Sequence, residues 1–287
     1  MIEKYPLLKH IIRFALEEDL GTGDVTTDSV IGPDMIGKAT LLAREELVLA
    51  GLPVFKQVFI ALGSGVEFED FFGEGDSVAA GDQVCILTGP LALILKAERT
   101  ALNFLQRMSG IATLTRKYVE KAGSSKVQVL DTRKTVPGHR WLDKYAVRTG
   151  GGCNHRFGLS DGILIKDNHI AVAGSIIKAV ELARKSAPHT LKVEVEVEDL
   201  PGVKEALKAG AHTIMLDNMD LKQMREAVRV VNKKALIEAS GGINLDTIKA
   251  VAKTGVDLIS VGALTHSPKA ADFSLEIIAA ASTSDAH

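Results

Sequence analysis

The feature that most constrains the fold is a regular alternation of short apolar runs and amphipathic segments after residue 125. The apolar runs have the length of buried strands, and several amphipathic segments are followed by a glycine, such as Gly210 and Gly255, where a helix must end. Alternation at this spacing indicates a parallel sheet with crossover helices, and therefore an α/β fold. We expect strands at Val127–Asp131, Gly162–Lys166, Lys192–Val197, Thr213–Asp217, Ala235–Ala239 and Asp257–Val261, and helices at Ser175–Ser186, Leu200–Ala209, Leu221–Asn232 and Leu245–Thr254.

Two further observations favour a closed or nearly closed barrel over an open doubly wound sheet. Six strands are clear and a seventh is possible, which suits a barrel. The first strand is followed by no GxGxxG motif, and the chain contains no GxxxxGK(S/T) motif, so the nucleotide-binding folds lack their usual support. In an α/β barrel the active site lies at the carboxyl ends of the strands.

The pattern of helical and β-like segments before residue 110 is typical of a small α+β domain. An amphipathic helix from about Leu7 to Asp19 opens it, and a longer helix from Leu91 to about Ala122 leads out of it. Between these helices, Gly-rich turns separate β-like runs at Lys38–Ala43, Val66–Phe71 and Gln83–Thr88. The expected domains are an N-terminal domain over residues 1–110, rejoined by the C-terminal segment 268–287, and a barrel over residues 111–267.

Composition excludes several classes of protein. With 46% hydrophobic and 24% charged residues, the chain is globular. Its apolar runs are far shorter than the roughly 20 residues of a membrane span, and its first ten residues lack a signal-peptide core, so a cytoplasmic location is expected. Cys85 and Cys153 stand far apart, which argues against a disulfide framework or a cysteine-based zinc site. The net charge of −2 gives no reason to expect nucleic acid or an anionic membrane as a partner.

Ionisable or Gly-rich sequence follows nearly every expected strand of the barrel. Such residues would meet at one rim, and six polar strand ends in register are hard to explain by solvation alone. Positive charge is also concentrated between residues 131 and 170, where a small polyanion could bind. The strand ends are Asp131-Thr132-Arg133-Lys134, Lys166-Asp167-Asn168-His169, Glu196, Asp217-Asn218, Ser240-Gly241-Gly242 and Gly262-Ala263-Leu264.

The third expected strand carries three glutamates that alternate with three valines, from Val193 to Glu198. If the valines pack on the outer helices, the glutamates face the barrel axis, where each carboxylate needs a cation. Lys134 or Lys166 is then expected to neutralise Glu194, which leaves Glu196 free for a metal or a sugar hydroxyl. The alternative is an edge strand with its glutamates in water.

Two kinds of anion site are indicated at this rim. The last two strand ends, Ser240–Gly242 and Gly262–Leu264, offer backbone N–H groups with few side chains, which suits a phosphate. Arg133 and Arg156, with Lys134 and His155 beside them, suit a substrate with two carboxylates, because a guanidinium binds a carboxylate with two hydrogen bonds.

Nine short segments, taken in order along the chain, resemble those of the quinolinate phosphoribosyltransferase family. The resemblance covers nearly the whole chain, and an ordered set of this kind is highly specific. Val136, His139 and Trp141 depart from the expected pattern, which puts loop packing in doubt rather than chemistry. The segments are Glu18–Asp24, Glu98–Asn103, Asp131–Thr135, Asn154–Arg156, Leu164–His169, Glu194–Glu196, Met215–Met219, Ala239–Gly242 and Gly262–Ser267.

The resemblance implies an N-terminal open sandwich, a seven-stranded α/β barrel and a homodimer with shared active sites, with any higher assembly left open. It implies decarboxylating transfer from phosphoribosyl pyrophosphate to quinolinate, giving nicotinate mononucleotide in NAD biosynthesis, with Mg²⁺ as cofactor. Arg133, Lys134, His155 and Arg156 would hold the quinolinate carboxylates, and Arg99 would arrive from the partner subunit. Lys166, Glu196 and Asp217 would surround the ribose, the pyrophosphate and Mg²⁺. Further substrate contacts are expected from Thr132, Ser240, Gly241, Gly242, Gly262, Ala263, Leu264 and His266.

Charge gives these residues their expected roles. Glu196 and Asp217 would stabilise the positive charge that develops on the ribose carbon, directly or through Mg²⁺, while Lys134 and Lys166 offset the charge of the departing pyrophosphate. Three alternatives remain open: a related phosphoribosyltransferase that takes nicotinate, a non-catalytic paralogue that binds a phosphorylated ligand and regulates a partner, and an aldolase-like barrel with Lys166 as its Schiff base.

Overall fold

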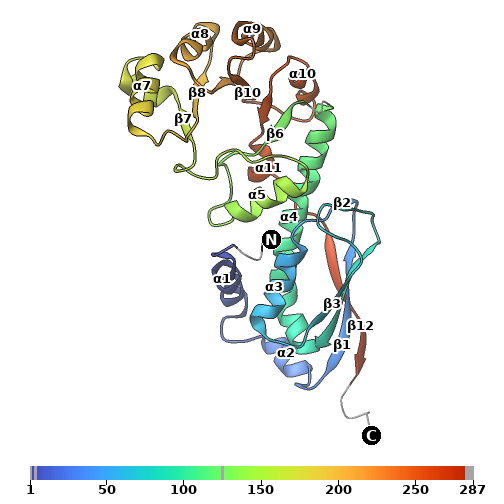
Figure 1. Ribbon diagram of the computed structural model, residues 1–287. Coiled ribbons are helices and arrows are strands. Elements are labelled where there is room, and N and C mark those ends of the chain that lie inside the picture. Colours follow the sequence, from blue (N-terminus) through green and yellow to red (C-terminus); the bar gives the residue numbers. More distant parts are fainter. Residues whose placement is uncertain (1, 3–4, 124–125, 282–287) are drawn as a thin grey trace. The chain divides into compact units, whose positions relative to one another are not determined.

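The computed structural model describes residues 2, 5–123 and 126–281 (Figure 1). The chain divides into two compact units. The first comprises Met1–Leu114, Pro137–Gly150 and Pro268–His287, and the second comprises Thr115–Val136 and Gly151–Ser267. Contacts thus group residues 137–150 with the first unit, whereas the expected division at residue 110 places them in the barrel.

The first unit is built on a four-stranded antiparallel sheet with the strand order β12-β1-β5-β3. The C-terminal strand pairs along the whole of β1, which places the end of the described chain in this unit. A short pair, β2 and β4, lies outside the sheet. The strands are β1 (Ile36–Ala43), β2 (Leu47–Val48), β3 (Glu67–Asp70), β4 (Ser77–Val78), β5 (Gln83–Pro90) and β12 (Phe273–Ala281). The helices are α1 (Leu8–Leu20), α2 (Val25–Val30), α3 (Leu52–Leu62), α5 (Arg140–Thr149) and the part of α4 (Leu91–Ala122) up to Leu114.

Two polar contacts hold α5 in the first unit. Asp143 is fully buried and accepts hydrogen bonds from both Arg107 Nε and Nη2 of α4, at 2.9 and 2.8 Å. Tyr145 donates from its hydroxyl to Glu74 at 2.7 Å, and the same carboxylate accepts from the amide of Leu52. A buried carboxylate held by a two-pronged guanidinium is a strong local constraint. These contacts explain why the segment packs here.

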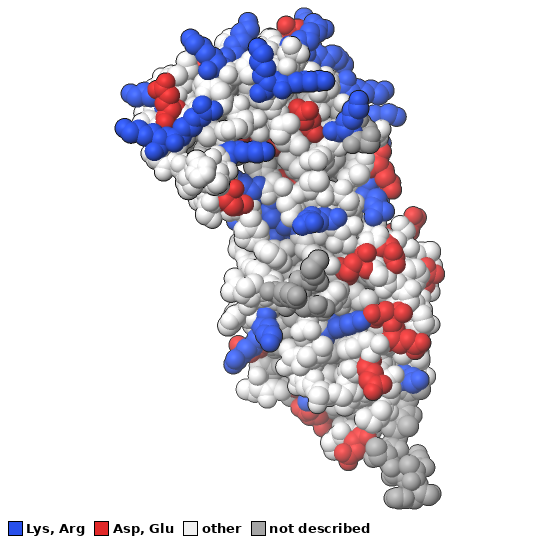
Figure 2. Space-filling view, in the orientation of Figure 1, with Lys and Arg blue, Asp and Glu red and all other residues white. Residues whose placement is uncertain are grey.

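The second unit is a six-stranded parallel sheet with the order β6-β11-β10-β9-β8-β7, which confirms the predicted fold class. Its strands are β6 (Gln128–Leu130), β7 (Ile163–Ile165), β8 (Val193–Val197), β9 (Thr213–Asp217), β10 (Leu236–Ser240) and β11 (Leu258–Ser260). Its helices are α6 (Asp167–Ala173), α7 (Ile176–Ser186), α8 (Leu200–Ala209), α9 (Leu221–Val231), α10 (Ile248–Ala252) and α11 (Ala263–His266). In Figure 1, α7 to α10 lie along the outer side of the strands, and Figure 2 shows Lys and Arg gathered over these helices.

The possible seventh strand is reduced to one isolated parallel bridge, between Leu130 and Cys153. Among the described residues, β6 and β7 are the two edge strands of the sheet and do not pair with each other. The irregular segment 151–162 lies between them in the chain: Cys153 bonds to β6, and Arg156 donates to the carbonyl of Gly162, just before β7, at 2.8 Å. Glycines at 150–152 explain why this segment pairs poorly, since they favour irregular backbone over a strand.

Local sequence signals set the ends of the outer helices. Asp199 caps α8 through the amide of Gly202, and Asp220 caps α9 in a reciprocal capping box with Gln223. Gly210 ends α8 in the left-handed conformation. No helix in the described residues is both long and apolar enough to cross a membrane.

Candidate active site

The carboxyl ends of the parallel strands surround a cavity of about 650 Å³ in the second unit. Its wall is rich in charged side chains and glycine, as the strand ends predict. It is lined by Thr132, Arg133, Lys134, His155, Arg156, Leu164, Lys166, Glu196, Met215, Asp217, Asn218, Glu238, Ser240, Gly241, Gly242 and Ser260.

Strand β8 lies between β7 and β9, so the edge-strand alternative for its glutamates is wrong. Val193, Val195 and Val197 are buried, and the glutamates occupy the other face. Lys166 donates to Glu196 at 2.6 Å. The expectation that a lysine neutralises Glu194 is also wrong, because His155 Nε2 lies 3.0 Å from its carboxylate.

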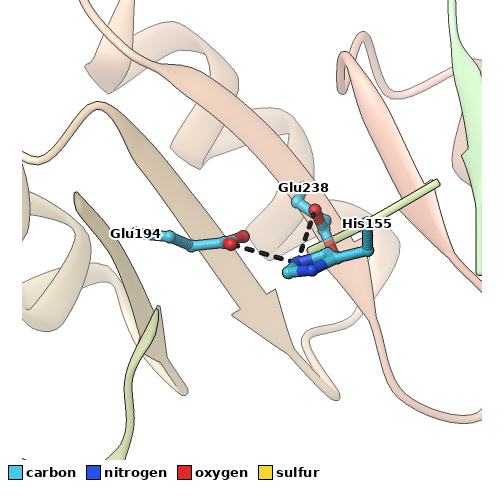
Figure 3. A group of neighbouring side chains, drawn as sticks. All are labelled: His155, Glu194 and Glu238. Atoms are coloured by element: carbon cyan, nitrogen blue, oxygen red, sulfur yellow. Dashed lines mark ion pairs between the residues drawn. The ribbon is translucent and has the colours of Figure 1, made fainter. Parts of the chain in front are cut away.

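The tautomer of His155 follows from the contacts of its two ring nitrogens. Figure 3 shows the ion pairs of the ring with Glu194 and Glu238. Its Nδ1 accepts a hydrogen bond from the amide of Arg156 at 2.7 Å, so this nitrogen carries no hydrogen. Nε2 therefore holds the ring proton and donates it to Glu194. The imidazole is neutral in this arrangement, and it presents no cation to a carboxylate ligand.

His155, Glu194 and Glu238 lie close enough together to suggest a metal site, but the tautomer argues against one. Their ligand atoms lie within 4.8 Å of one another. A histidine bound to a metal through Nε2 normally donates from Nδ1, whereas Nδ1 of His155 accepts. The cluster is better described as two carboxylates that share one N–H donor.

Glu238 is the most deeply buried acid of this cluster. Its side chain is 1% exposed, and its Oε2 lies 3.8 Å from His155 Nε2. Its Oε1 is buried and has no hydrogen-bond partner among the described residues. Burial and the charge of Glu194 raise the pKa of Glu238 to about 8. Glu238 was not predicted from the sequence, although a lone acid inside the apolar run 235–239 was the available signal.

Arg133 and Arg156 form the cationic part of the wall. Arg156 Nη1 donates to Gly162, but its buried Nε has no partner in the described chain. Burial and the neighbouring charge of Arg133 lower the pKa of Arg156. The fully buried Asp131 fixes the loop by accepting from the amide of His155 at 2.9 Å. Two adjacent guanidinium groups held in this way favour an anionic ligand.

Comparisons with known proteins assign this arrangement to a family. Residues 111–276 match the C-terminal domain of quinolinate phosphoribosyl transferase, and residues 24–109 match its N-terminal domain. The chain belongs to the quinolinate phosphoribosyltransferase family. A probable nicotinate-nucleotide pyrophosphorylase (carboxylating) of Bacillus subtilis is 44% identical, over 94% of this chain and 93% of that protein. A mitochondrial quinolinate phosphoribosyltransferase (decarboxylating) of Nicotiana tabacum is 41% identical, over 94% and 82%.

Solved structures of the same family share the fold. The crystal structure of NadC from Streptococcus pyogenes has a TM-score of 0.92 and 44% identity, covering 94% of this chain and 97% of that chain. The nicotinate-nucleotide pyrophosphorylase from Francisella tularensis has a TM-score of 0.92 and 42% identity, covering 97% and 99%. The likeness therefore extends over both units.

The cavity gathers most of the residues expected from the family resemblance, and five do not line it. Gly262 and His266 lie beside Lys134: a Cβ at Gly262 would be 3.1 Å from Lys134 Cδ and from His266 Cδ2. Leu264 is fully buried and packs in the core. Arg99 belongs to the first unit. The gathered residues are Thr132, Arg133, Lys134, His155, Arg156, Lys166, Glu196, Asp217, Ser240, Gly241 and Gly242, and no described contact places Ala263 at the wall.

His139 and Trp141, which depart from the family pattern, pack against other aromatic rings of the first unit. Trp141 stacks on Tyr5 with ring centroids 4.5 Å apart, and His139 stacks on Phe104 at 5.7 Å. Val136 is 39% exposed. The ring contacts therefore give His139 and Trp141 a part in loop packing.

If the Ser240–Gly242 loop binds phosphate, as its sequence indicates, replacing Gly241 by Ala should raise the KM for phosphoribosyl pyrophosphate about tenfold. Gly241 has φ +92°, and a Cβ there would lie 2.9 Å from the backbone N of Asn218, so the loop must move. Gly174→Ala is the matched control, because φ is +94° there but no atom lies within 4 Å of the added carbon. The control should lower thermal stability and leave KM unchanged. Equal KM values for both variants would contradict this role of the loop.

Proposed function

We propose that this protein transfers the phosphoribosyl group of phosphoribosyl pyrophosphate to quinolinate, with loss of one carboxyl group as CO₂. The products are nicotinate mononucleotide and pyrophosphate. The observation that carries the proposal is one cavity in which two arginines and two lysines face two strand-end carboxylates and a glycine loop. Relatives above 40% identity carry this activity in their names, which supports it further.

Arg133 and Arg156 are proposed to bind the two carboxylates of quinolinate. The unpartnered Nε of Arg156 can donate to a ligand, and the mutual repulsion of the guanidinium groups is relieved by a dianion. His155 is proposed to line the site through its neutral ring rather than as a third cation, since both ring nitrogens are engaged by protein groups. A second carboxylate distinguishes quinolinate from nicotinate here.

The phosphates are proposed to lie toward the glycine loops and the lysines. Ser240–Gly242 offers backbone groups where side chains are small, and Gly262 lies against Lys134. Lys134 and Lys166 would offset the charge of the departing pyrophosphate. No nucleophilic side chain is needed, because the quinolinate nitrogen attacks the ribose carbon itself.

Glu196 and Asp217 are proposed to face the ribose and to hold Mg²⁺. Asp217 ends β9 and Glu196 is the last residue but one of the neighbouring strand β8, and hard carboxylate oxygens suit this ion. When bound, Mg²⁺ would supply positive charge next to the pyrophosphate oxygens. The carboxylates themselves would stabilise the cationic ribose carbon, and Lys166 holds Glu196 in position at 2.6 Å.

The assembly is proposed to be a homodimer in which each subunit supplies Arg99 to its partner's site. Arg99 is an exposed residue of α4 in the first unit. A two-fold dimer makes the same contact twice, so such sharing would be reciprocal.

The direct test is incubation with quinolinate, phosphoribosyl pyrophosphate and Mg²⁺, followed by detection of CO₂ and nicotinate mononucleotide. Both products are expected in equal amounts. Turnover of nicotinate in place of quinolinate would overturn the proposal. Borohydride trapping of a substrate on Lys166 would instead favour an aldolase-like reaction.

Replacing Arg133 or Arg156 by Ala is expected to raise KM for quinolinate about 10- to 100-fold, because each change removes a charge-assisted pair of about 1.5–3 kcal/mol. KM for phosphoribosyl pyrophosphate should change much less. Steady-state kinetics with each substrate varied in turn measures both values. A variant that lost phosphoribosyl pyrophosphate binding and kept quinolinate binding would reverse the assignment.

A further inference from the structure

The proposed reaction needs a proton that neither carboxylate of quinolinate supplies. When CO₂ leaves, the broken carbon–carbon bond deposits its electron pair on the ring carbon beside the nitrogen. That carbon must gain a proton to become the C–H of nicotinate mononucleotide. Without a nearby acid the electron pair can recombine with CO₂, so the site benefits from a proton donor at the cavity wall. This inference rests on the proposed function.

The His155 cluster contains such an acid. Glu194 and Glu238 approach the same Nε2, at 3.0 and 3.8 Å, and the tautomer of His155 offers them only one hydrogen. Glu194 takes that hydrogen bond because it lies closer. Glu238 is 1% exposed and so lacks water to stabilise a second negative charge. Glu238 must therefore hold a proton of its own.

The groups that face Glu238 are consistent with a neutral carboxylic acid. Glu194 from β8 disfavours its ionised form, while His155 and the hydroxyl of Ser260 from β11 partly oppose this effect. The partner of Glu238 in β9 is Met215, which does not titrate. Burial outweighs the two opposing contacts, and the pKa of Glu238 rises to about 8. Most of the population then holds the proton at neutral pH.

Glu238 also lines the cavity that would receive the substrate. Its side chain is hydrogen-bonded to Glu194 and to Ser260, and its buried Oε1 makes no hydrogen bond in the described chain. The other acids of the wall, Glu196 and Asp217, stand at the strand ends, and Glu196 already accepts from Lys166. Among the described acids of this wall, only Glu238 has a buried carboxyl oxygen without a hydrogen-bond partner.

We propose that Glu238 is the catalytic acid that protonates the ring carbon as CO₂ departs. The C–C electron pair becomes the new C–H bond with the Glu238 proton, and Glu238 is left as a carboxylate. His155 can then turn its Nε2–H from Glu194 toward this new charge, 3.8 Å away. Water restores the proton after product release. No electron leaves or enters the site.

The test separates the two chemical steps in a single turnover of Glu238→Gln. Gln keeps the size and the neutral charge but has no acidic proton. Pyrophosphate release should stay within about twofold of wild type, and CO₂ release should slow by about 100-fold or more, with accumulation of the carboxylated mononucleotide. Glu198→Gln, at an exposed carboxylate beyond the end of β8, is the matched control and should leave both steps unchanged.

Two further measurements test the role of Glu238 in the CO₂ step. Glu238→Asp should restore part of the CO₂ step, and it serves as the test if Gln destabilises the fold. The CO₂ step of wild type should slow as pH rises above about 8, whereas that of Glu238→Gln should not. Equal slowing of both steps by Gln, or unchanged CO₂ release, would overturn the role of Glu238. A wild-type protein that releases neither product would instead refute the proposed function.

Discussion

Replacing Glu196 by Gln, or Asp217 by Asn, is expected to lower kcat about 100- to 1000-fold while quinolinate affinity changes by less than about threefold. Each substitution keeps the shape of the side chain and removes its negative charge. That charge matters most when the ribose carbon is cationic, which occurs only near the transition state. Loss of charge at this point should therefore appear in turnover rather than in ground-state binding.

The two variants should differ in one respect. Glu196 accepts from Lys166 at 2.6 Å, so Gln at this position leaves the lysine without its ion-pair partner. Asp217 accepts instead from the uncharged side-chain amide of Asn218 at 3.0 Å. Lys166 is then freer to bind substrate anions in Glu196→Gln, and the KM for phosphoribosyl pyrophosphate should fall only in that variant.

Pre-steady-state kinetics and quinolinate titration together measure these effects. Glu226→Gln is a suitable control, because this exposed carboxylate on α9 pairs with Arg229, three residues away. Its kinetics should match wild type. Wild-type turnover in both active-site variants would mean that the two carboxylates have a structural role.

Sequence predicts well those parts of the fold whose conformation is set by neighbouring residues in the chain. The bounds of α4, α8 and β9 agree with the predicted ranges, and Asp199 and Gly210 mark the two ends of α8. The alternation in β8 predicts correctly which side chains face inward, since a period of two fixes the face of every residue. Those faces in turn bring the strand-end residues of the site together.

The partners of inward-facing side chains could not be predicted in the same way. Whether Glu194 meets a lysine or His155 depends on how far each strand is staggered and on the path of the irregular segment 151–162. Glu238 escaped notice because it lies inside a strand rather than at its end. Leu264 was expected at the phosphate loop, but its side chain completes the core behind that loop. Each of these outcomes is set by tertiary packing.

The burial of Glu238 connects the fold to the chemistry. A barrel interior disfavours any charge without a partner, and here two acids enter it with one N–H donor between them. A hydrophobic side chain at 238 would remove this conflict, and core substitutions of similar volume are often tolerated. The buried acid instead holds a proton at neutral pH beside the substrate cavity.

Mixing Arg99→Ala with Lys134→Ala subunits is expected to recover about a quarter of wild-type activity from two nearly inactive proteins. The prediction rests on the proposed homodimer, in which each site takes Arg99 from one chain and Lys134 from the other. In a mixed dimer, one site collects both defects and the other has neither. Random exchange makes about half the dimers mixed, each with one intact site of two.

A second pair of variants distinguishes sharing from a general effect of mixing. Lys134 and Arg133 line the same cavity within one unit, so mixed dimers of Lys134→Ala and Arg133→Ala leave one defect in every site. That mixture should recover no activity, whereas Arg99→Ala with Arg133→Ala should recover as much as the first pair. Subunit exchange is verified by mass spectrometry of differently tagged chains. If the Arg99 mixtures stay at the level of the separate variants after exchange, Arg99 acts in its own chain's site or outside any site.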